Sequence, residues 1–417
     1  MKWQIRVATQ LALFSMLLVC LSGCFKDHCT HTYTLYKPIY ASLTEARANM
    51  KSNAPVAVKQ PGKIYLYGNY IFMNENNRGI HVIDNSQPTN PKNIAFITIP
   101  GNADMAVKGN ILYADSYSDM VAFDISNPKQ VVAKKFLNNV FPHRNQYYNT
   151  SNANPDSVKI IINWETRDTT VDCDTYQYLY SSYYALAGAD SKGNYASPQQ
   201  GIGGSMACFT LVNDYLYTVS SSNLSSFDLS VPQDPVFKNT KSIGWGVETI
   251  FPFKENLFIG TTTGMFIYDV SSPASPTQVA QYSHVRSCDP VIADGDNAYV
   301  TLRTGTTCAG NINQLDVLNI STLSSPSLLK TYQMTNPHGL SKDGDLLFVC
   351  DGTDGLKVYD ATHPTSLKLL KKVSGIKTFD VIAWNKKAIV VGEDGLYQFD
   401  YSNSNDIRLL SKITLSK

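Results

Sequence analysis

One short signature recurs along this chain and limits what the chain can fold into. Each copy contains an apolar stretch, an acid or amide, an apolar residue, a hydroxyl residue and usually a proline, as in Asp124-Ile-Ser-Asn-Pro128. The acid or amide lies at Asp84, Asp124, Asp228, Asp269, Asn319, Asp360 and Asp400, at successive intervals of 40, 104, 41, 50, 41 and 40 residues. A period near 40 residues indicates an array of repeated units.

The content of each unit predicts β-strands rather than helices. Short runs rich in Val, Ile, Tyr and Phe alternate with turn residues, as in 346–350 followed by 355–360. Asp-Gly pairs such as Asp351-Gly352 supply the positive φ of tight hairpins. The Asp and Ser side chains of the signature can bond nearby backbone amides, and proline ends the strand, so the signature marks a strand exit. With one run before and one after, each unit has four strands.

Four antiparallel strands per repeat of about 40 residues form the blade of a β-propeller. Residues 61–417 hold seven such units once the long interval is set aside; six or eight blades are the alternatives. We therefore predict an all-β chain, with a seven-bladed propeller of four-stranded antiparallel blades over 61–417. The long interval places an insertion at 140–204, between blades 2 and 3.

The units resemble the LVIVD repeat, a family of β-propeller repeats in secreted and surface proteins. The segments 79–84 and 355–360, Gly-Ile-His-Val-Ile-Asp and Gly-Leu-Lys-Val-Tyr-Asp, carry the core of that pattern. Asn319 departs from it, because an amide replaces the acid there. The resemblance implies a fold and hardly any activity, since propellers host many unrelated functions.

The first residues have the form of a bacterial lipoprotein signal. Lys2 and Arg6 precede an apolar run over 7–21, which ends in Leu21-Ser-Gly-Cys24. This lipobox predicts a signal peptide over 1–23 and lipidation of Cys24. An uncleaved transmembrane anchor is the alternative, but the run has about 15 residues where a span needs about 20.

The residues after Cys24 predict the membrane in which the lipoprotein resides, and they form a tether. By resemblance to other lipoproteins, the absence of Asp at position 25 argues against the inner membrane, so we expect an outer-membrane lipoprotein that faces the periplasm or the cell surface. Lys26-Asp27 resembles the export tags of some Bacteroidetes lipoproteins. Residues 24–60 form the tether, in which Ser42 and Glu45 predict a capped short helix over 42–50.

Charge gives no sign of a nucleic-acid partner. The chain has 35 basic and 34 acidic residues with no basic cluster, so the electrostatic footprint for nucleic acid is missing. Tyrosine is common, with 25 copies, as in secreted β proteins. The partners that we expect are the membrane, through Cys24, and an unidentified protein or glycan.

Six cysteines remain outside the signal and the lipidation site, an even number that suits an oxidising compartment. Cys288 precedes the inner strand of blade 5, and Cys308 lies between its second and third strands. The two loops open on the same face of a propeller, so a disulfide between them is expected, with free thiols as the alternative. No Cys-x-x-Cys spacing exists, and no zinc site is predicted.

Acidic residues and one histidine are predicted at the mouth of the central channel, where the inner strands begin. Counting back ten residues from the aromatic position of the second strand gives Glu248, Asp289 and His338, and counting back nine gives Asp104 and Asp380. Such a group could hold a cation or act as an acid and base pair. It could equally satisfy the polar groups of the strand ends in a water-filled channel, and we favour this structural interpretation.

The insertion over 140–204 is the second candidate for recognition. It contains eight tyrosines and one strand-like run over 158–164. Long loops in compact repeats usually serve a function or are disordered, and tyrosine supplies rigid, amphipathic contact area. A small cap over the channel is the alternative.

These features together predict a lipid-anchored propeller of the cell envelope that binds a protein or glycan partner. The competing class is an enzyme of the hydrolase, lyase or quinoprotein type, or a metal-binding protein, that uses the channel mouth. The sequence has no nucleophile elbow, His-Glu-x-x-His motif or phosphate loop. Accordingly, no catalytic residue, resident metal or cofactor is assigned.

Replacing the lipidated cysteine tests the anchor. Cys24→Ser removes the thiol that accepts the diacylglyceryl group, so we expect uncleaved or unlipidated protein that leaves the membrane fraction, because stable anchoring needs more than one acyl chain. Intact mass and fractionation measure this. A native protein whose mature N-terminus carries no lipid would contradict the assignment.

Peptide mapping without reduction tests the predicted disulfide. Cys288 and Cys308 should be recovered in one linked pair of peptides, because adjacent loops in an oxidising compartment bring the two thiols within bonding reach. Free alkylation of both thiols in the native protein is the contrary outcome.

Overall fold

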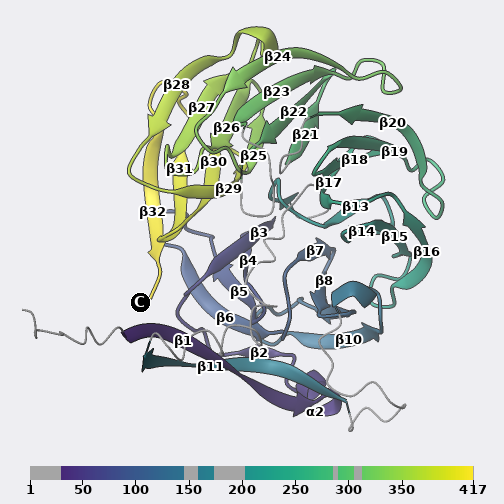
Figure 1. The fold of residues 1–417 in the computed structure, drawn as a ribbon, viewed down its shortest axis with the longest axis vertical. Coiled ribbons are helices and arrows are strands. Elements are labelled where there is room, and N and C mark those ends of the chain that lie inside the picture. The colour runs from purple at the N-terminus through teal and green to yellow at the C-terminus, as the bar shows by residue number, and fades with distance from the viewer. Residues whose placement is uncertain (1–29, 145–157, 173–201, 285–289, 305–311, 417) are drawn as a thin grey trace, which may run out of the picture. The chain divides into compact units, whose positions relative to one another are not determined.

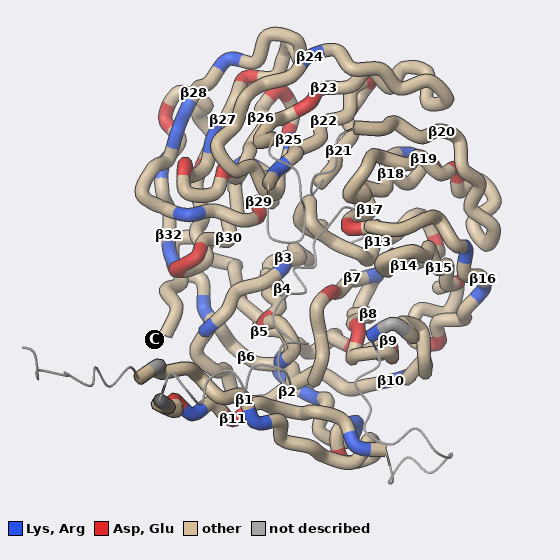
Figure 2. Tube along the Cα trace, viewed as in Figure 1, with Lys and Arg blue, Asp and Glu red and all other residues tan. Residues whose placement is uncertain are grey.

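Seven four-stranded antiparallel blades follow one another along the chain and form a β-propeller, so the predicted fold class is confirmed. The structure is a computed structural model that describes residues 30–144, 158–172, 202–284, 290–304 and 312–416. In Figure 1 the first strand of each blade lies toward the centre and the fourth strand lies at the rim. Figure 2 shows basic and acidic residues interspersed around the ring.

Each blade uses one uninterrupted stretch of four strands. Blade 1 contains β3 (Pro61–Tyr67), β4 (Tyr70–Glu75), β5 (Gly79–Asp84) and β6 (Lys92–Thr98). Blade 2 contains β7 (Met105–Lys108), β8 (Ile111–Ser116), β9 (Asp119–Asp124) and β10 (Val132–Leu137). Blade 3 contains β13 (Phe209–Val212), β14 (Tyr215–Val219), β15 (Asn223–Asp228) and β16 (Val236–Ser242). Blade 4 contains β17 (Val247–Phe253), β18 (Asn256–Thr261), β19 (Gly264–Asp269) and β20 (Thr277–Ser283).

The last three blades repeat the plan. Blade 5 contains β21 (Val291–Asp294), β22 (Asn297–Leu302), β23 (Gln314–Asn319) and β24 (Ser327–Gln333). Blade 6 contains β25 (Leu340–Asp343), β26 (Leu346–Cys350), β27 (Leu356–Asp360) and β28 (Lys368–Val373), with the 3-10 turn η2 (Pro364–Ser366). Blade 7 contains β29 (Thr378–Trp384), β30 (Lys387–Gly392), β31 (Gly395–Asp400) and β32 (Arg408–Thr414).

The recurring signature is a side-chain-capped turn at the end of each third strand. In all seven copies the acid or amide accepts a hydrogen bond from the backbone N–H two residues later, at 2.7 to 3.0 Å. The bonds to Ser126 and the nearby Lys134 lower the pKa of Asp124 to about 2. The signature therefore ends a strand, as its sequence predicts.

The signature proline also links one blade to the next. Tyr113 Oη in blade 2 donates to the carbonyl of Pro232 in blade 3 at 2.7 Å, and Tyr217 Oη in blade 3 donates to Pro273 in blade 4 at 2.9 Å. The rings of both tyrosines are completely buried at the third residue of their strands. Each aromatic ring thus fills the interface between two blades, and its hydroxyl donates a hydrogen bond to the neighbouring blade.

The ring closes without exchange of a strand, because blade 7 is built from C-terminal strands and blade 1 from N-terminal ones. Side chains join these two blades: Gln398 Nε2 donates to Asn85 Oδ1 at 2.7 Å, and Ser411 Oγ donates to the carbonyl of Pro88 at 2.7 Å. An apolar cluster that includes Ile64 and Ile382 fills the interior. We call this junction the seam.

The region before blade 1 contains one expected and one unexpected element. The predicted helix is present as α2 (Leu43–Ala48), where Ser42 Oγ accepts a bond from Glu45 N at 3.1 Å. The strand β1 (Thr30–Ser42) was not predicted; it pairs with β11 (Lys159–Asp172) of the insertion. A short β2 (Ser52–Asn53) adds to β6 at the outer edge of blade 1.

Within the insertion, η1 (Pro142–Arg144) follows blade 2, and β11 extends the strand-like run seen in the sequence. The chain divides into two units, 1–38 with 164–189, and 39–163 with 190–417. In the first, the described parts of β1 and β11 are joined by polar pairs, such as Thr34 Oγ1 donating to Asp168 at 2.8 Å. The second contains the propeller.

A matched pair of glycine substitutions tests the blade geometry. Gly355 directly precedes β27 and has φ +88°, and a Cβ there would lie 1.9 Å from the carbonyl oxygen of Val373. Gly355→Ala should lower the free energy of unfolding by about 2–4 kcal/mol. Gly344 has φ +56° and open space around it, so Gly344→Ala should cost only about 1 kcal/mol. Denaturant unfolding measures both; equal losses would contradict the close approach.

Candidate functional site

One register position marks the beginning of every inner strand. It lies nine residues before the third residue of the second strand, and the ladders align it across the blades. The residues at this position are Lys63, Asp104, Cys208, Thr249, Pro290, Gly339 and Asp380, in blade order. We call this set the mouth ring.

The predicted mouth residues fall on two different positions. Asp104 and Asp380 belong to the mouth ring, whereas Glu248 and His338 lie one residue earlier. Neighbouring residues of a strand face opposite sides, so the structure brings the two aspartates to equivalent places and does not add Glu248 or His338 to them. Asp289 lies outside the described residues.

A segment from the end of the insertion runs through the centre of the ring. β12 (Ile202–Gly203) pairs with β3 on the side opposite β4, which is the axial side of blade 1. Residues 202–207 are all buried. We call 202–208 the channel segment, because it occupies the axis at the mouth.

The channel segment is bonded to blades all around the ring. Ser205 Oγ accepts a hydrogen bond from Leu340 N of blade 6 at 2.6 Å. Ala207 O accepts one from Ile250 N of blade 4 at 3.1 Å. Gly204 N donates to Ile64 O of blade 1 at 3.3 Å. These contacts make the segment part of the folded core.

A buried ion pair lies beside the segment. Lys63 Nζ contacts Asp104 Oδ2 at 2.6 Å, with side-chain exposures of 8% and 4%. Lys63 Nζ also lies 3.8 Å from Cys208 Sγ, and the backbone N–H of Cys208 donates to Asp104. Burial raises the pKa of the Asp104 carboxyl, and the Lys63 ammonium opposes that rise.

Asp380 binds the channel segment from blade 7. Its Oδ1 accepts hydrogen bonds from Ser205 N at 3.2 Å, Ser205 Oγ at 3.3 Å and Val381 N at 2.9 Å. Its Oδ2 is buried and accepts no hydrogen bond within the described part of the chain. Burial raises the pKa of Asp380 to about 7, and the surrounding hydrogen bonds and Lys63 only partly oppose this.

His338 and Glu248 have other surroundings. His338 Nε2 pairs with Asn336 Oδ1 at 2.8 Å, and its ring packs edge-on against Phe379 with centroids 5.4 Å apart. Burial, together with the positive charges of Arg303 and Lys377, lowers the pKa of His338 to about 3. The imidazole is therefore neutral at physiological pH. Glu248 is half-buried, and its carbonyl accepts a bond from Cys208 Sγ at 3.5 Å.

This arrangement is suited to holding strand ends together. The carboxylates of the ring bond to backbone amides and to Lys63, and their burial keeps them from solvent. Among the described residues, no group of three or more His, Cys, Asp or Glu side chains could hold a metal ion. Cys350 is a fully buried thiol, and Cys288 and Cys308 lie outside the described residues.

The most exposed large apolar side chain of the described chain lies on the same face as the mouth. Trp245, at 85% exposure, sits in the loop from β16 to β17, which opens where the inner strands begin. It is flanked by Gly244 with φ +103° and Gly246 with φ +76°. Thr262 N donates to Gly246 O at 2.8 Å, which fixes the loop on blade 4.

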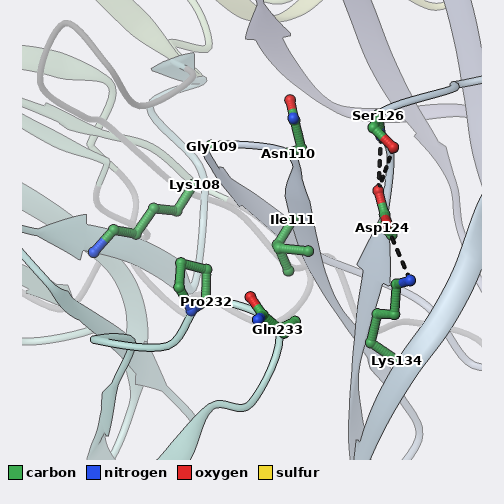
Figure 3. Close-up of a pocket in the computed structure, with 9 residues that line it drawn as sticks. All are labelled: Lys108, Gly109, Asn110, Ile111, Asp124, Ser126, Lys134, Pro232 and Gln233. Atoms are coloured by element: carbon green, nitrogen blue, oxygen red, sulfur yellow. Dashed lines mark hydrogen bonds and ion pairs between the residues drawn. The ribbon is translucent and has the colours of Figure 1, made fainter.

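A polar hollow of about 440 Å³ opens between blades 2 and 3 near their signature turns, on the opposite face from the mouth (Figure 3). Asp124 bonds to Ser126 and to Lys134 there, the latter at 3.1 Å. Lys108 pairs with Asp214. Both lysines of the hollow thus have acidic partners, and the hollow offers no unmatched charge to a ligand.

Sequence reasoning missed Lys63, Cys208, Ser205 and Trp245. The count of nine residues would have found two of them, because it gives Lys63 from Phe72 and Cys208 from Tyr217. A tryptophan between two glycines was a visible sign of a loop that presents an aromatic ring. Ser205 gave no local sign, since its partners lie 135 and 175 residues away in the sequence.

Comparison with protein families bears on the four-stranded units described above. The LVIVD repeat matches residues 61–95, 100–135, 256–284 and 291–334. The chain carries LVIVD repeats. The matched segments fall on blades 1, 2, 4 and 5, and the other three blades contain the same signature turn. No curated protein is significantly similar in sequence.

Solved structures share the fold of this LVIVD-repeat propeller. The periplasmic gluconolactonase PpgL of Pseudomonas aeruginosa is 13% identical, with a TM-score of 0.52, over 85% of this chain and 96% of that one. The computationally designed protein Ika8 is 9% identical, with a TM-score of 0.51, over 86% and 89%. A protein from Lactobacillus plantarum is 12% identical, with a TM-score of 0.51, over 77% and 87%. At these identities the similarity shows the fold alone.

Within the described residues, no helix is long and apolar enough to cross a membrane.

Proposed function

We propose that this propeller is a lipid-anchored binding module of the cell envelope that recognises a protein or glycan partner through its mouth face. The observation that carries the proposal is Trp245, held 85% exposed by a loop that is hydrogen-bonded to blade 4. Tryptophan is enriched among the residues that contribute most to binding at protein interfaces.

The surroundings of Trp245 suit recognition by stacking and hydrogen bonding. Hydroxyl side chains lie on the adjoining loops: Ser221, whose carbonyl accepts from Val247 N at 3.2 Å, and Thr263, which is exposed. A flat aromatic ring beside neutral donors and acceptors fits the apolar face and hydroxyls of a sugar, or a tyrosine-rich protein surface.

The tyrosine-rich insertion supports the same face. It leaves blade 2 after β10 and enters blade 3 at β13, so both of its ends belong to the connection that opens at the mouth. Because the other loops of a repeat protein stay short, binding area is gained most readily by lengthening such a loop. Cys24 would place the module at the outer membrane, facing the periplasm or the cell surface.

The enzyme alternative would use the channel mouth, and the geometry there favours it less. Asp104 and Asp380 are 3% and 4% exposed, and the channel segment lies against both. A general acid or base needs access to a substrate proton. The propeller fold shared with a gluconolactonase carries no catalytic residue over to this chain.

Two variants and a matched control test the proposed binding face. Deleting 145–200 keeps the channel segment, so the propeller should retain a cooperative thermal transition while losing partner capture, because each blade packs against its neighbours. Trp245→Ala should reduce binding at least about tenfold, as hot-spot residues do. Trp384, 51% exposed at the opposite end of its inner strand, provides the control Trp384→Ala.

Glycan arrays and cross-linking to envelope proteins in cells measure the two classes of partner. Loss of binding in the Trp384 variant but not in the Trp245 variant would overturn the proposed face. A deletion that unfolds the propeller would mean that the insertion is a structural cap.

A further inference from the structure

The channel segment is the structural feature that neither the repeat nor the proposed binding face accounts for. It joins the two sides of the seam: β12 pairs with β3 of blade 1, and Ser205 bonds to Asp380 of blade 7. Ile202 lies in the apolar cluster that contains Ile64 of blade 1 and Ile382 of blade 7. The segment therefore acts as a clasp across the only junction that connects the two ends of the propeller.

We propose that Asp380 makes this clasp proton-dependent, so that the channel segment is held firmly in acidic solution and loosens as the pH rises to neutrality.

The geometry encloses the carboxyl group with backbone on both sides. A Cβ at Gly204 would lie 1.9 Å from Asp380 Oδ2, and one at Gly339 would lie 2.2 Å from Oδ1. Both positions therefore need glycine for the carboxyl to fit. Three donors converge on Oδ1, whereas Oδ2 faces the backbone of Gly204 with no hydrogen bond from the described residues.

The charges around the Asp380 carboxyl do not offset the rise in its pKa that burial causes. Lys63, across the seam, is the cation whose field reaches Asp380, and its ammonium is bonded to Asp104 at 2.6 Å. The buried thiol of Cys350, on β26, is the other titratable group coupled to Asp380. The channel segment contributes the neutral Ser205. Within the described part of the chain Asp380 forms no ion pair, which favours the protonated form of its carboxyl.

The direction of the pH effect follows from the raised pKa. The pKa of Asp380 is about 7 in the folded protein, against about 3.9 for an aspartate in an unfolded chain. The closed clasp therefore binds a proton that the open clasp releases. Below about pH 4 Asp380 is protonated in both the closed and the open clasp, so burying it carries no electrostatic cost. Above about pH 7 the cost of burying the ionised carboxyl is fully present. Between pH 6 and pH 8 the equilibrium constant for opening should rise about tenfold.

Hydrogen exchange of the full-length protein tests the clasp. Amides of 202–208 and of 339–341 should lose about tenfold protection between pH 6 and pH 8, after correction for intrinsic exchange. Peptides of β18, in blade 4, serve as the internal control and should not change. Asp380→Asn keeps an oxygen for the three donors but cannot ionise, so its protection should be the same at both pH values.

Two results would overturn the inference: equal protection of the wild-type segment at pH 6 and pH 8, or a pH dependence that persists in Asp380→Asn. If that variant does not fold, selective carboxyl labelling of wild-type aspartate with ¹³C provides the decision. An Asp380 signal that titrates near the ordinary value for aspartate contradicts the proposal, and one that titrates near neutrality supports it. The inference rests on the channel segment alone and stands or falls separately from the proposed binding function.

Discussion

Closure of the ring is the constraint on which the rest of this structure depends. Many small contacts hold each blade to its neighbour, but the seam must join residues from opposite ends of the propeller domain. None of the described strands is shared across it. Hydrogen bonds from side chains, an apolar cluster and the channel segment close the seam instead. The burial of polar groups at the mouth follows, because residues that tie the seam must be satisfied inside the protein.

The repeated signature has a structural meaning that its composition only partly reveals. The acid caps the turn, and the proline carbonyl accepts a hydrogen bond from a hydroxyl group of the preceding blade. Pro232 accepts one from Tyr113, and Pro88 accepts one from Ser411 of blade 7. A residue pattern that recurs this often could be mistaken for a ligand motif. Its contacts among the described residues lie within the propeller or with β2 at the edge of blade 1, where Ser52 Oγ donates to the carbonyl of Pro128 at 3.2 Å. Recognition is therefore more readily sought in the parts of the chain that break the repeat.

Sequence reasoning recovered what local chemistry dictates. The period near 40, the turn glycines and the Asp-Ser pairs act within a few residues of each other, and they were sufficient to predict seven blades. The Ser42 cap of α2 was recovered for the same reason. The pairing of β1 with β11 and the path of the channel segment were missed, because they depend on partners more than 100 residues apart, as in Thr34 with Asp168 and Ser205 with Asp380. Glu248 and His338 lie one residue before the mouth ring. This offset depends on where each loop joins its inner strand, which the composition does not encode.

The channel segment also has a consequence for the order in which this protein is assembled. Its bonds to Leu340 and Asp380 span 135 and 175 residues, so the entropy of closing those loops must be overcome before the contacts form. Each blade, by contrast, is contiguous and can pair its strands as soon as they are available. We therefore expect the contacts of the channel segment with blades 6 and 7 to form late in folding, after those blades have been made.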